Sequence, residues 1–181
     1  MIVQKTKIKD LYLISPKVFK DLRGYFFESF NLQKFKEQTN LKIEFVQDNQ
    51  SCSSKGVLRG LHFQKPPHAQ AKLVSVIKGA VLDVAVDIRK NSPTYGQYII
   101  EELNEENHLM MYLPEGIAHG FMTLQDNSIF SYKCSNYYNK ESEDCIIWND
   151  PIIGIQWPNI EPILSEKDQN AKNFASFVSP F

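Results

Sequence analysis

Short stretches in which apolar and polar residues alternate run through most of this chain. The clearest is residues 82–89, where Leu82, Val84 and Val86 alternate with Asp83 and Asp87. Because successive side chains of a strand point to opposite faces, the pattern predicts a β-strand with Leu82, Val84 and Val86 on one face. Further strands are predicted at residues 17–30, interrupted at Arg23-Gly24, and at residues 43–52, 57–64, 72–78, 97–103, 108–113, 118–124 and 128–135.

Turn-forming residues separate these stretches, for example Asn91-Ser92-Pro93 and Pro114-Glu115-Gly116. Many short, evenly spaced strands predict an all-β fold, either a barrel or a double-sheet roll. Helix is expected only at residues 32–38 and 165–174, and the second of these begins with Ser165 in a pattern that resembles a capped start. A chain of 181 residues buries a sizeable core, so the simplest expectation is one compact domain of residues 1–181.

Net charge, apolar runs and cysteine spacing indicate what the protein binds and where it is located. The net charge of -1 gives no general attraction to nucleic acid or to an anionic membrane. The apolar runs are too short for a transmembrane helix, and the start MIVQKTKIKD lacks the apolar core of a signal peptide, so we expect a cytoplasmic protein. Cys52, Cys134 and Cys145 are odd in number and widely spaced, which argues against a disulfide framework and predicts reduced thiols.

Cofactor and metal motifs are missing from the sequence. No strand is followed by a GxGxxG or GxxxxGKS loop, so neither a bound dinucleotide nor an ATP-driven reaction is expected. The four histidines, His62, His68, His108 and His119, raise the question of a metal site. Metal-binding barrels commonly use an HxH pair, but Phe63 and Gln64 follow His62, so we predict no metal.

His62 and Arg59 lie in the apolar stretch VLRGLHFQ at residues 57–64. A histidine in such a stretch is commonly a hydrogen-bonded core residue, but a purely structural strand has no reason to hold a cation as well. Regular alternation puts Arg59 and His62 on opposite faces of the strand. A shared site therefore requires a bulge or a sharp twist at Gly60.

Three further residues have both a structural and a functional interpretation. Tyr132 shares a predicted strand face with Phe130 and, taken alone, reads as a core aromatic residue with its hydroxyl at the rim. Lys72 precedes an apolar run and reads by default as a solvated strand end. His119 lies between Ala118 and Gly120, small residues that let a ligand approach closely.

Taken together, several motifs resemble the dTDP-4-dehydrorhamnose 3,5-epimerase family over nearly the whole chain. They include FKDLRGYFFE at residues 19–28, VQDNQS at 46–51, VLRGLHFQ at 57–64, QAKLV at 70–74, VLDVAVDIRKNSPTYG at 81–96, PEGIAHGF at 114–121, Tyr132-Lys133-Cys134, Tyr137-Tyr138, WNDP at 148–151, IQWP at 155–158 and LSEKD at 164–168. One departure is Asn139-Lys140, where many members have a small residue followed by proline.

The resemblance implies a cupin-like jelly-roll barrel with short flanking helices, a homodimer, and dTDP-4-keto-6-deoxy-D-glucose as substrate. It makes His62 the base, Asp168 its orienting partner and Tyr132 the acid, with Lys72 facing the enolate oxygen. Residues implied in substrate binding are Phe19, Arg23, Glu28, Gln47, Asp48, Asn49, Arg59, His119, Tyr138, Glu143 and Lys167.

Physical chemistry agrees with these roles. A ketone at C4 acidifies the hydrogens on C3 and C5, because either carbanion is delocalised as an enolate, so no redox cofactor is needed. An imidazole oriented by an aspartate suits proton removal, and a cation stabilises the developing oxyanion. Arginine forks suit the diphosphate.

Alternative functions remain open. A relative that acts at C5 alone or at C3 alone keeps the same acid and base. A non-catalytic cupin-like binding module would not need Lys72, His62, Tyr132 and Asp168 together, and a metal-dependent cupin would contain stoichiometric metal.

Overall fold

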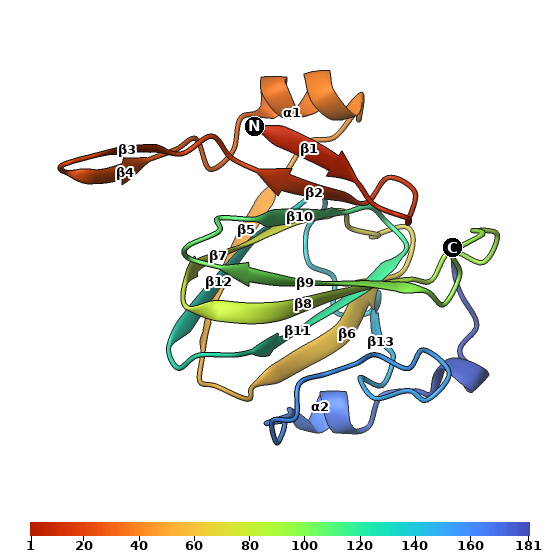
Figure 1. The fold of residues 1–181 in the computed structure, drawn as a ribbon. Helices are drawn as coiled ribbons and strands as arrows, with labels where there is room; N and C mark the ends of the chain where they lie inside the picture. The colour runs from red at the N-terminus through yellow and green to blue at the C-terminus, as the bar shows by residue number, and fades with distance from the viewer.

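Two antiparallel β-sheets packed face to face dominate the computed structural model, which describes residues 1–181. The six-stranded sheet contains, in spatial order, β1 (Ile2–Lys5), β2 (Tyr12–Ser15), β10 (Met110–Leu113), β7 (Lys72–Lys78), β12 (Ser128–Cys134) and β5 (Gln47–Ser53). The five-stranded sheet contains β13 (Glu143–Cys145), β6 (Leu58–Gln64), β11 (Ile117–Thr123), β8 (Ala80–Asp87) and β9 (Tyr98–Asn104). Together they form the predicted cupin-like jelly-roll barrel (Figure 1).

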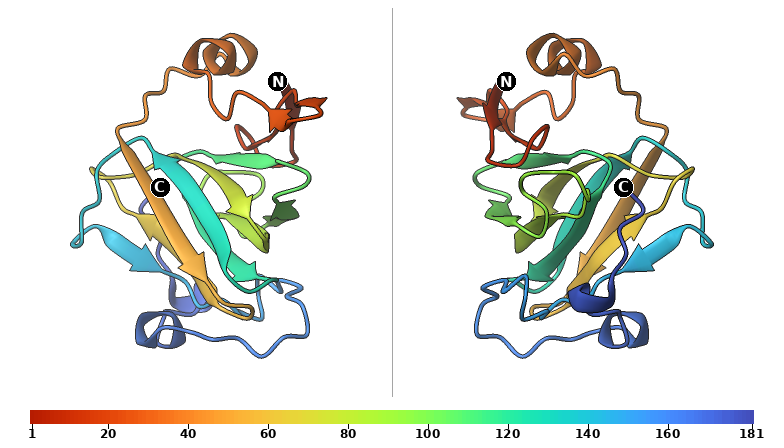
Figure 2. Two further views of the ribbon diagram at one scale, coloured as in Figure 1. Left: turned by 90° about the vertical axis from the view of Figure 1, so that its left-hand side faces the viewer. Right: turned by 90° about the vertical axis from the view of Figure 1, so that its right-hand side faces the viewer.

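The remaining elements flank the barrel. Strands β3 (Phe19–Asp21) and β4 (Gly24–Phe26) form a separate hairpin that projects from it (Figure 1). Helix α1 (Leu32–Thr39) lies on one side of the barrel, and α2 (Glu166–Gln169) lies on the opposite side (Figure 2). A 3₁₀ turn, η1 (Phe174–Ser176), follows α2. None of the helices has the length and apolar character needed to cross a bilayer.

The main hydrophobic core lies between the two sheets. Val74 and Phe130 reach it from the six-stranded sheet, and Ala85 and Phe121 reach it from the five-stranded sheet. A second cluster packs the C-terminal segment against the five-stranded sheet, and a third lies under α1 around Phe35. The C-terminal segment covers the outer face of the five-stranded sheet, so its central strands β8 and β11 are buried on both sides.

Strand β8 is buried on both faces, although it contains two aspartates. Val84 and Val86 belong to the second cluster, whereas Ala85 belongs to the main core, so both faces of the predicted alternating strand are buried. Asp83 and Asp87 are consequently fully buried, with 0% exposure. A buried carboxylate is costly unless hydrogen-bonded, so each of the two requires partners.

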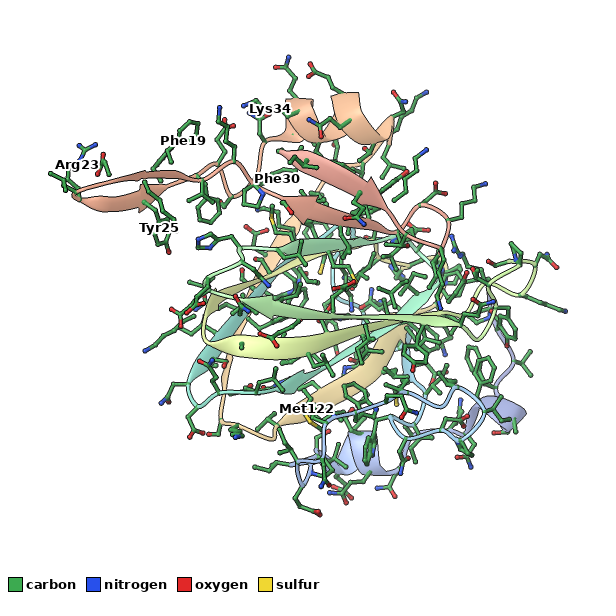
Figure 3. The ribbon with its side chains drawn as sticks, viewed as in Figure 1. Phe19, Arg23, Tyr25, Phe30, Lys34 and Met122 are labelled. Atoms are coloured by element: carbon green, nitrogen blue, oxygen red, sulfur yellow. The ribbon has the colours of Figure 1, made fainter.

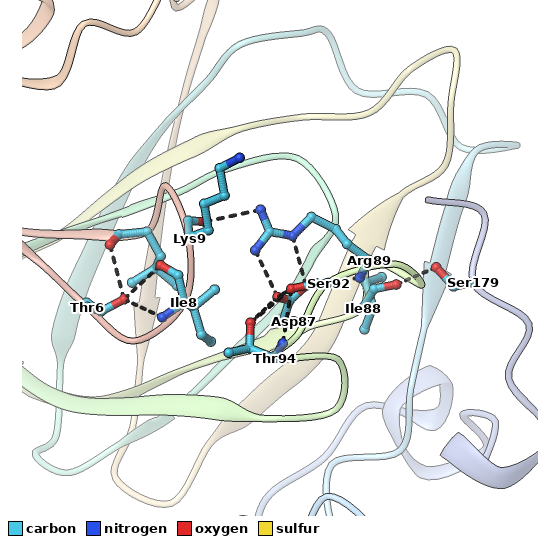
Figure 4. A network of polar contacts seen from close by, with 10 residues as sticks. Thr6, Ile8, Lys9, Asp87, Ile88, Arg89, Ser92, Thr94 and Ser179 are labelled. Carbon is cyan, nitrogen blue, oxygen red and sulfur yellow. Dashed lines mark hydrogen bonds and ion pairs between the residues drawn. The ribbon is translucent and has the colours of Figure 1, made fainter.

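Asp87 finds its partners in the loop that follows β8 (Figure 4). Its Oδ1 accepts hydrogen bonds from the backbone N and the Nε of Arg89, and its Oδ2 accepts from Arg89 Nη2, Ser92 Oγ and Thr94 Oγ1 at 2.6–2.8 Å. Arg89 Nη1 also donates to the carbonyl of Lys9. Burial raises the pKa of Asp87, but these hydrogen bonds outweigh it and lower the pKa to about 2.

Most sequence predictions of secondary structure are confirmed to within a few residues at each end. The prediction at residues 17–30 is wrong in extent, because only two three-residue strands form around the turn at Arg23, in a hairpin that projects from the barrel (Figure 1). The helix predicted at 165–174 is reduced to the four residues of α2. Strands β1, β2 and β13 were not predicted.

His108, the first residue of the strand predicted at 108–113, lies outside the observed strand. It precedes β10 with a φ of 51°, and its ring lies 4.8 Å from that of Tyr25 and 4.7 Å from that of Phe27. It thus packs against the aromatic side chains of the hairpin segment.

Candidate active site

Two adjoining hollows of about 170 and 110 Å³ lie inside the barrel and share His62, Lys72 and Tyr132. The larger is also lined by Gln50, Ser51, Arg59, His119, Phe121 and Phe130. The smaller is also lined by Gln47, Asn49, Phe63, Gln64, Gln70, Tyr138 and Glu143. Because the two hollows share three residues, they form one cavity.

A bulge in β6 brings Arg59 and His62 to the same cavity. His62 of β6 pairs with His119 of β11, whereas Arg59 pairs with Phe121. Two residues of β6 therefore lie opposite the single residue Gly120, which reverses the alternation between Arg59 and His62. The alternation of the sequence predicted that a shared site requires such a bulge, and the structure confirms it.

Two glycines make this bulge possible. Gly60 has a φ of +147°, a backbone conformation that residues other than glycine rarely adopt. A Cβ at Gly60 would lie 2.5 Å from Cα of Gly120, and a Cβ at Gly120 would lie 2.8 Å from the carbonyl oxygen of Arg59. The close approach of β6 and β11 at this point therefore requires glycine at both positions.

His62 is oriented by a buried carboxylate from α2. Its Nε2 lies 2.5 Å from Oδ1 of Asp168, and Oδ2 of Asp168 accepts a hydrogen bond from Ser165 Oγ at 2.7 Å. Ser165 is also the N-cap of α2 and accepts from the backbone N of Asp168. Burial raises the pKa of Asp168, but the hydrogen bonds from His62 and Ser165 and the charge of Lys167 outweigh it, so that the net pKa lies below its usual range.

Lys72 and Tyr132 reach the cavity from the opposite sheet, on β7 and β12. Burial lowers the pKa of Lys72, while Cys134, Asp83 and Glu143 act in the other direction. Burial raises the pKa of Tyr132, so its hydroxyl stays protonated at neutral pH. The Lys72 ammonium lies 5.8 Å from the centroid of the Tyr132 ring.

His119 forms a second imidazole–carboxylate pair in the cavity wall. Its Nε2 lies 2.8 Å from Oδ1 of Asp83, and its ring stacks on Phe130 at a centroid distance of 6.0 Å. Arg59, which lines the same hollow, donates to Ser53 Oγ from Nε and Nη2.

The mouth of the smaller hollow is polar. Lys167 of α2 forms an ion pair with Glu143 at 2.7 Å, and the hydroxyl of Tyr138 donates to the same carboxylate at 3.1 Å. Burial raises the pKa of Glu143, but the contacts with Lys167 and Tyr138 outweigh this effect, so the net pKa lies below its usual range. Gln47 accepts from the backbone N of Tyr138 and donates to Asn49.

Four residues that the sequence suggested for substrate binding lie elsewhere in this chain. Asp48 points to the outer face of β5, where it pairs with Lys133, because it alternates with Gln47 and Asn49. Phe19 and Arg23 lie on the projecting hairpin, with Arg23 near its tip (Figure 3). Glu28 follows the hairpin and is bound by Lys34 and Asn31 next to α1.

Sequence reasoning missed several residues of the cavity. Phe130 was recognisable because it shares a strand face with Tyr132, and Ser165 because it starts a capped helix. Asp83 carried no local signal beyond its place in an alternating strand. No three His, Cys, Asp or Glu side chains gather closely enough to hold a metal ion.

Comparison with known proteins agrees with this geometry. The family model described as dTDP-4-dehydrorhamnose 3,5-epimerase matches residues 5–176. A protein of that name from Salmonella typhimurium is 55% identical over 172 residues, which are 94% of each chain.

Two solved structures with nucleotide sugars bound are also similar. The dTDP-6-deoxy-D-glucose-3,5-epimerase of Legionella pneumophila, in complex with dTDP-4-keto-L-rhamnose, superposes with a TM-score of 0.94 at 46% identity, covering 98% of this chain and 94% of the other. A 3'-monoepimerase from Streptomyces bikiniensis, in complex with dTDP-quinovose, superposes with a TM-score of 0.90 at 35% identity, covering 94% and 87%. With a family model matched over nearly its whole length, this chain belongs to the dTDP-4-dehydrorhamnose 3,5-epimerase family.

Proposed function

We propose that this protein is a dTDP-4-dehydrorhamnose 3,5-epimerase of dTDP-L-rhamnose biosynthesis. It inverts C3 and C5 of dTDP-4-keto-6-deoxy-D-glucose by removing and returning protons through an enolate. The observation that carries the proposal is that His62 and Tyr132 come from opposite sheets and line the same cavity. Inversion of a carbon requires a base on one face of the sugar ring and an acid on the other, and these two residues supply them.

His62 acts as the base. Because its Nε2 is hydrogen-bonded to Asp168, the ring nitrogen left to take up the substrate proton is Nδ1. The Asp168 carboxylate then stabilises the imidazolium that forms. The electron pair of the broken C–H bond moves onto the C4 oxygen, where the Lys72 ammonium stabilises the enolate in a desolvated setting.

Tyr132 acts as the acid. Its hydroxyl is protonated at neutral pH, since burial raises its pKa, and it delivers a proton to the face of the ring opposite His62. Arg59 lines the larger hollow, and its forked guanidinium can donate paired hydrogen bonds to the diphosphate. The polar mouth with Tyr138 and Glu143 suits the nucleoside.

Proton NMR in deuterium oxide tests the proposal. The purified protein is incubated with dTDP-4-keto-6-deoxy-D-glucose and no added cofactor, and deuterium is followed at each ring carbon. Label at both C3 and C5 is expected. Label at one carbon alone favours a single-site epimerase such as the similar 3'-monoepimerase, and no label refutes the enolate reaction.

Variants assign the roles in the same assay. His62→Ala is expected to abolish exchange at both carbons, whereas Tyr132→Phe retains some exchange but impairs correct reprotonation. His68→Ala serves as the control, because His68 lines neither hollow. Full epimerisation by His62→Ala would exclude it as the base.

We further propose that the active form is a homodimer in which the β3–β4 hairpin of one protomer completes the cavity of its partner. Phe19, Tyr25 and Phe26 are 54%, 58% and 68% exposed on this hairpin, which is unusual for aromatic residues without a partner. A second copy would cover them and would bring Arg23 to the nucleotide.

Mixing two inactive variants tests the dimer. Arg23→Ala lacks the hairpin cation and His62→Ala lacks the base, so each is expected to be impaired alone. After co-refolding, the mixed dimer contains one site with both intact residues, and activity is expected to return. A monomer by light scattering, or no recovery on mixing, contradicts the shared site.

A further inference from the structure

Asp83 is a carboxylate that lies behind the cavity residue His119, and the reaction described above does not use it. It is fully buried on β8, and its Oδ1 lies 2.8 Å from Nε2 of His119. Its Oδ2 is buried without any hydrogen-bond partner. Burying a carboxylate oxygen without a hydrogen-bond partner costs folding free energy, so a group in this state is a candidate for a functional role.

The second imidazole–carboxylate pair differs from the catalytic one. Asp168 is satisfied on both oxygens, by His62 and by Ser165, whereas Asp83 has only its contact with His119. Burial raises the pKa of Asp83, and the contacts with His119 and Lys72 offset that rise only in part, so the net pKa lies above its usual range. In return, Asp83 is one of the negative groups that oppose the lowering of the Lys72 pKa by burial.

The contacts of the His119 ring define which nitrogen a ligand meets. One ring face stacks on Phe130, and the Nε2 edge is turned to Asp83. His119 nevertheless lines the larger hollow, so Nδ1 is the nitrogen left for a ligand. A carboxylate only accepts hydrogen bonds, so it requires the ring proton on Nε2 and leaves Nδ1 as an acceptor. Two cations, Arg59 and Lys72, line the same hollow, and a ring that carries its proton on Nε2 alone places no third positive charge beside them.

We propose that Asp83 is a positioning residue that holds His119 as the Nε2–H tautomer, so that Nδ1 accepts a hydrogen bond from a hydroxyl group of the sugar. The role in substrate binding rests on the proposed function. The tautomer itself does not, because it is a property of the protein without substrate.

Nitrogen-15 NMR of histidine-labelled protein tests the tautomer directly. The chain has four histidines, so the His119 signals are identified as those lost in His119→Gln. At neutral pH and without substrate, Nε2 is expected to carry the proton and Nδ1 to be unprotonated. A proton on Nδ1, or on both nitrogens, overturns the proposal whether or not the protein is an epimerase.

Asp83→Leu tests the consequence for substrate binding. The variant removes the acceptor, and KM is expected to rise by about tenfold with kcat changed less, the size of one lost hydrogen bond. Asp87→Asn is the control, because Asp87 is equally buried on the same strand, but its partners Arg89, Ser92 and Thr94 line neither hollow. A folded Asp83→Leu with unchanged KM overturns the positioning role, and should Asp83→Leu fail to fold, the tautomer of the wild-type protein still decides.

Discussion

Replacing Asp87 by asparagine is expected to destabilise the protein in a pH-dependent way. Asp87 accepts five hydrogen bonds from Arg89, Ser92 and Thr94, all of which favour the ionised carboxylate (Figure 4). Its pKa is lowered from an ordinary value of 3.8 to about 2. At about 1.4 kcal/mol per pKa unit, this corresponds to about 2–3 kcal/mol of folding free energy. Arg89 is 21% exposed, and solvent screening reduces the contribution to about 1–2 kcal/mol.

The lowered pKa determines how the stabilisation by Asp87 changes with pH. The carboxylate binds its proton more weakly in the folded state, so the stabilisation is present above pH 3.8 and is lost as the pH falls towards 2. The asparagine variant has no ionisable group at this position. The difference in unfolding free energy between wild type and Asp87→Asn is therefore expected to be largest at pH 7 and to shrink by about 1–2 kcal/mol between pH 5 and pH 2.

Urea denaturation at fixed protein concentration measures this difference. Asp21→Asn is the matched control, since Asp21 pairs with Arg23 at the same spacing of two residues but on the exposed hairpin. It is expected to leave the free energy of unfolding unchanged. A difference for Asp87→Asn that stays constant from pH 7 to pH 2 refutes the reasoning, because the carboxylate charge then contributes nothing.

Three other predictions concern the cavity and the core. Gly60→Ala is expected to lower the free energy of unfolding by more than about 2 kcal/mol, because its Cβ meets Gly120; Gly24→Ala, with nothing within 4 Å, loses less, and equal melting temperatures would contradict this. Ser165→Ala removes the N-cap of α2 and a hydrogen bond to Asp168, so it is expected to cost about 1 kcal/mol and to lower kcat several-fold; an unchanged kcat in steady-state assays speaks against orientation through Ser165. With a thiol reagent, only Cys52 is expected to react in the folded protein, because Cys134 and Cys145 are buried with raised pKa values; three fast thiols before denaturant is added would be incompatible with this packing.

Local pattern was enough to predict most of the strands and one detail of the site. Alternation identified β8, and the conflict between Arg59 and His62 indicated that a site shared by the two requires a bulge or a sharp twist at Gly60, where the structure has a bulge. Both follow from the two-residue period of a strand, which depends only on neighbours in sequence. The edge strand β1 and the three-residue β13 were missed because such short segments show too few alternations.

These local patterns did not predict which side chains far apart in the sequence pair with one another. His62 and Asp168 are 106 residues apart, and only family resemblance connected them. Asp83 and His119 are 36 residues apart, and their pairing depends on the register between β8 and β11, which neither pattern nor resemblance indicated. Resemblance also suggested Phe19, Arg23 and Glu28, but it did not indicate that they lie outside the cavity of their own chain.

The position of Asp168 makes the catalytic pair depend on how the C-terminal segment docks. Helix α2 has only four residues, too few to be stable alone, so its place is set by what surrounds it. An isolated bridge joins Val57 to Ile163 before the helix, and another joins Ile146 to Lys172 after it. Release of this segment would withdraw Asp168 from His62 while leaving the barrel core intact. In the proposed mechanism, activity therefore depends on this docking as well as on the barrel.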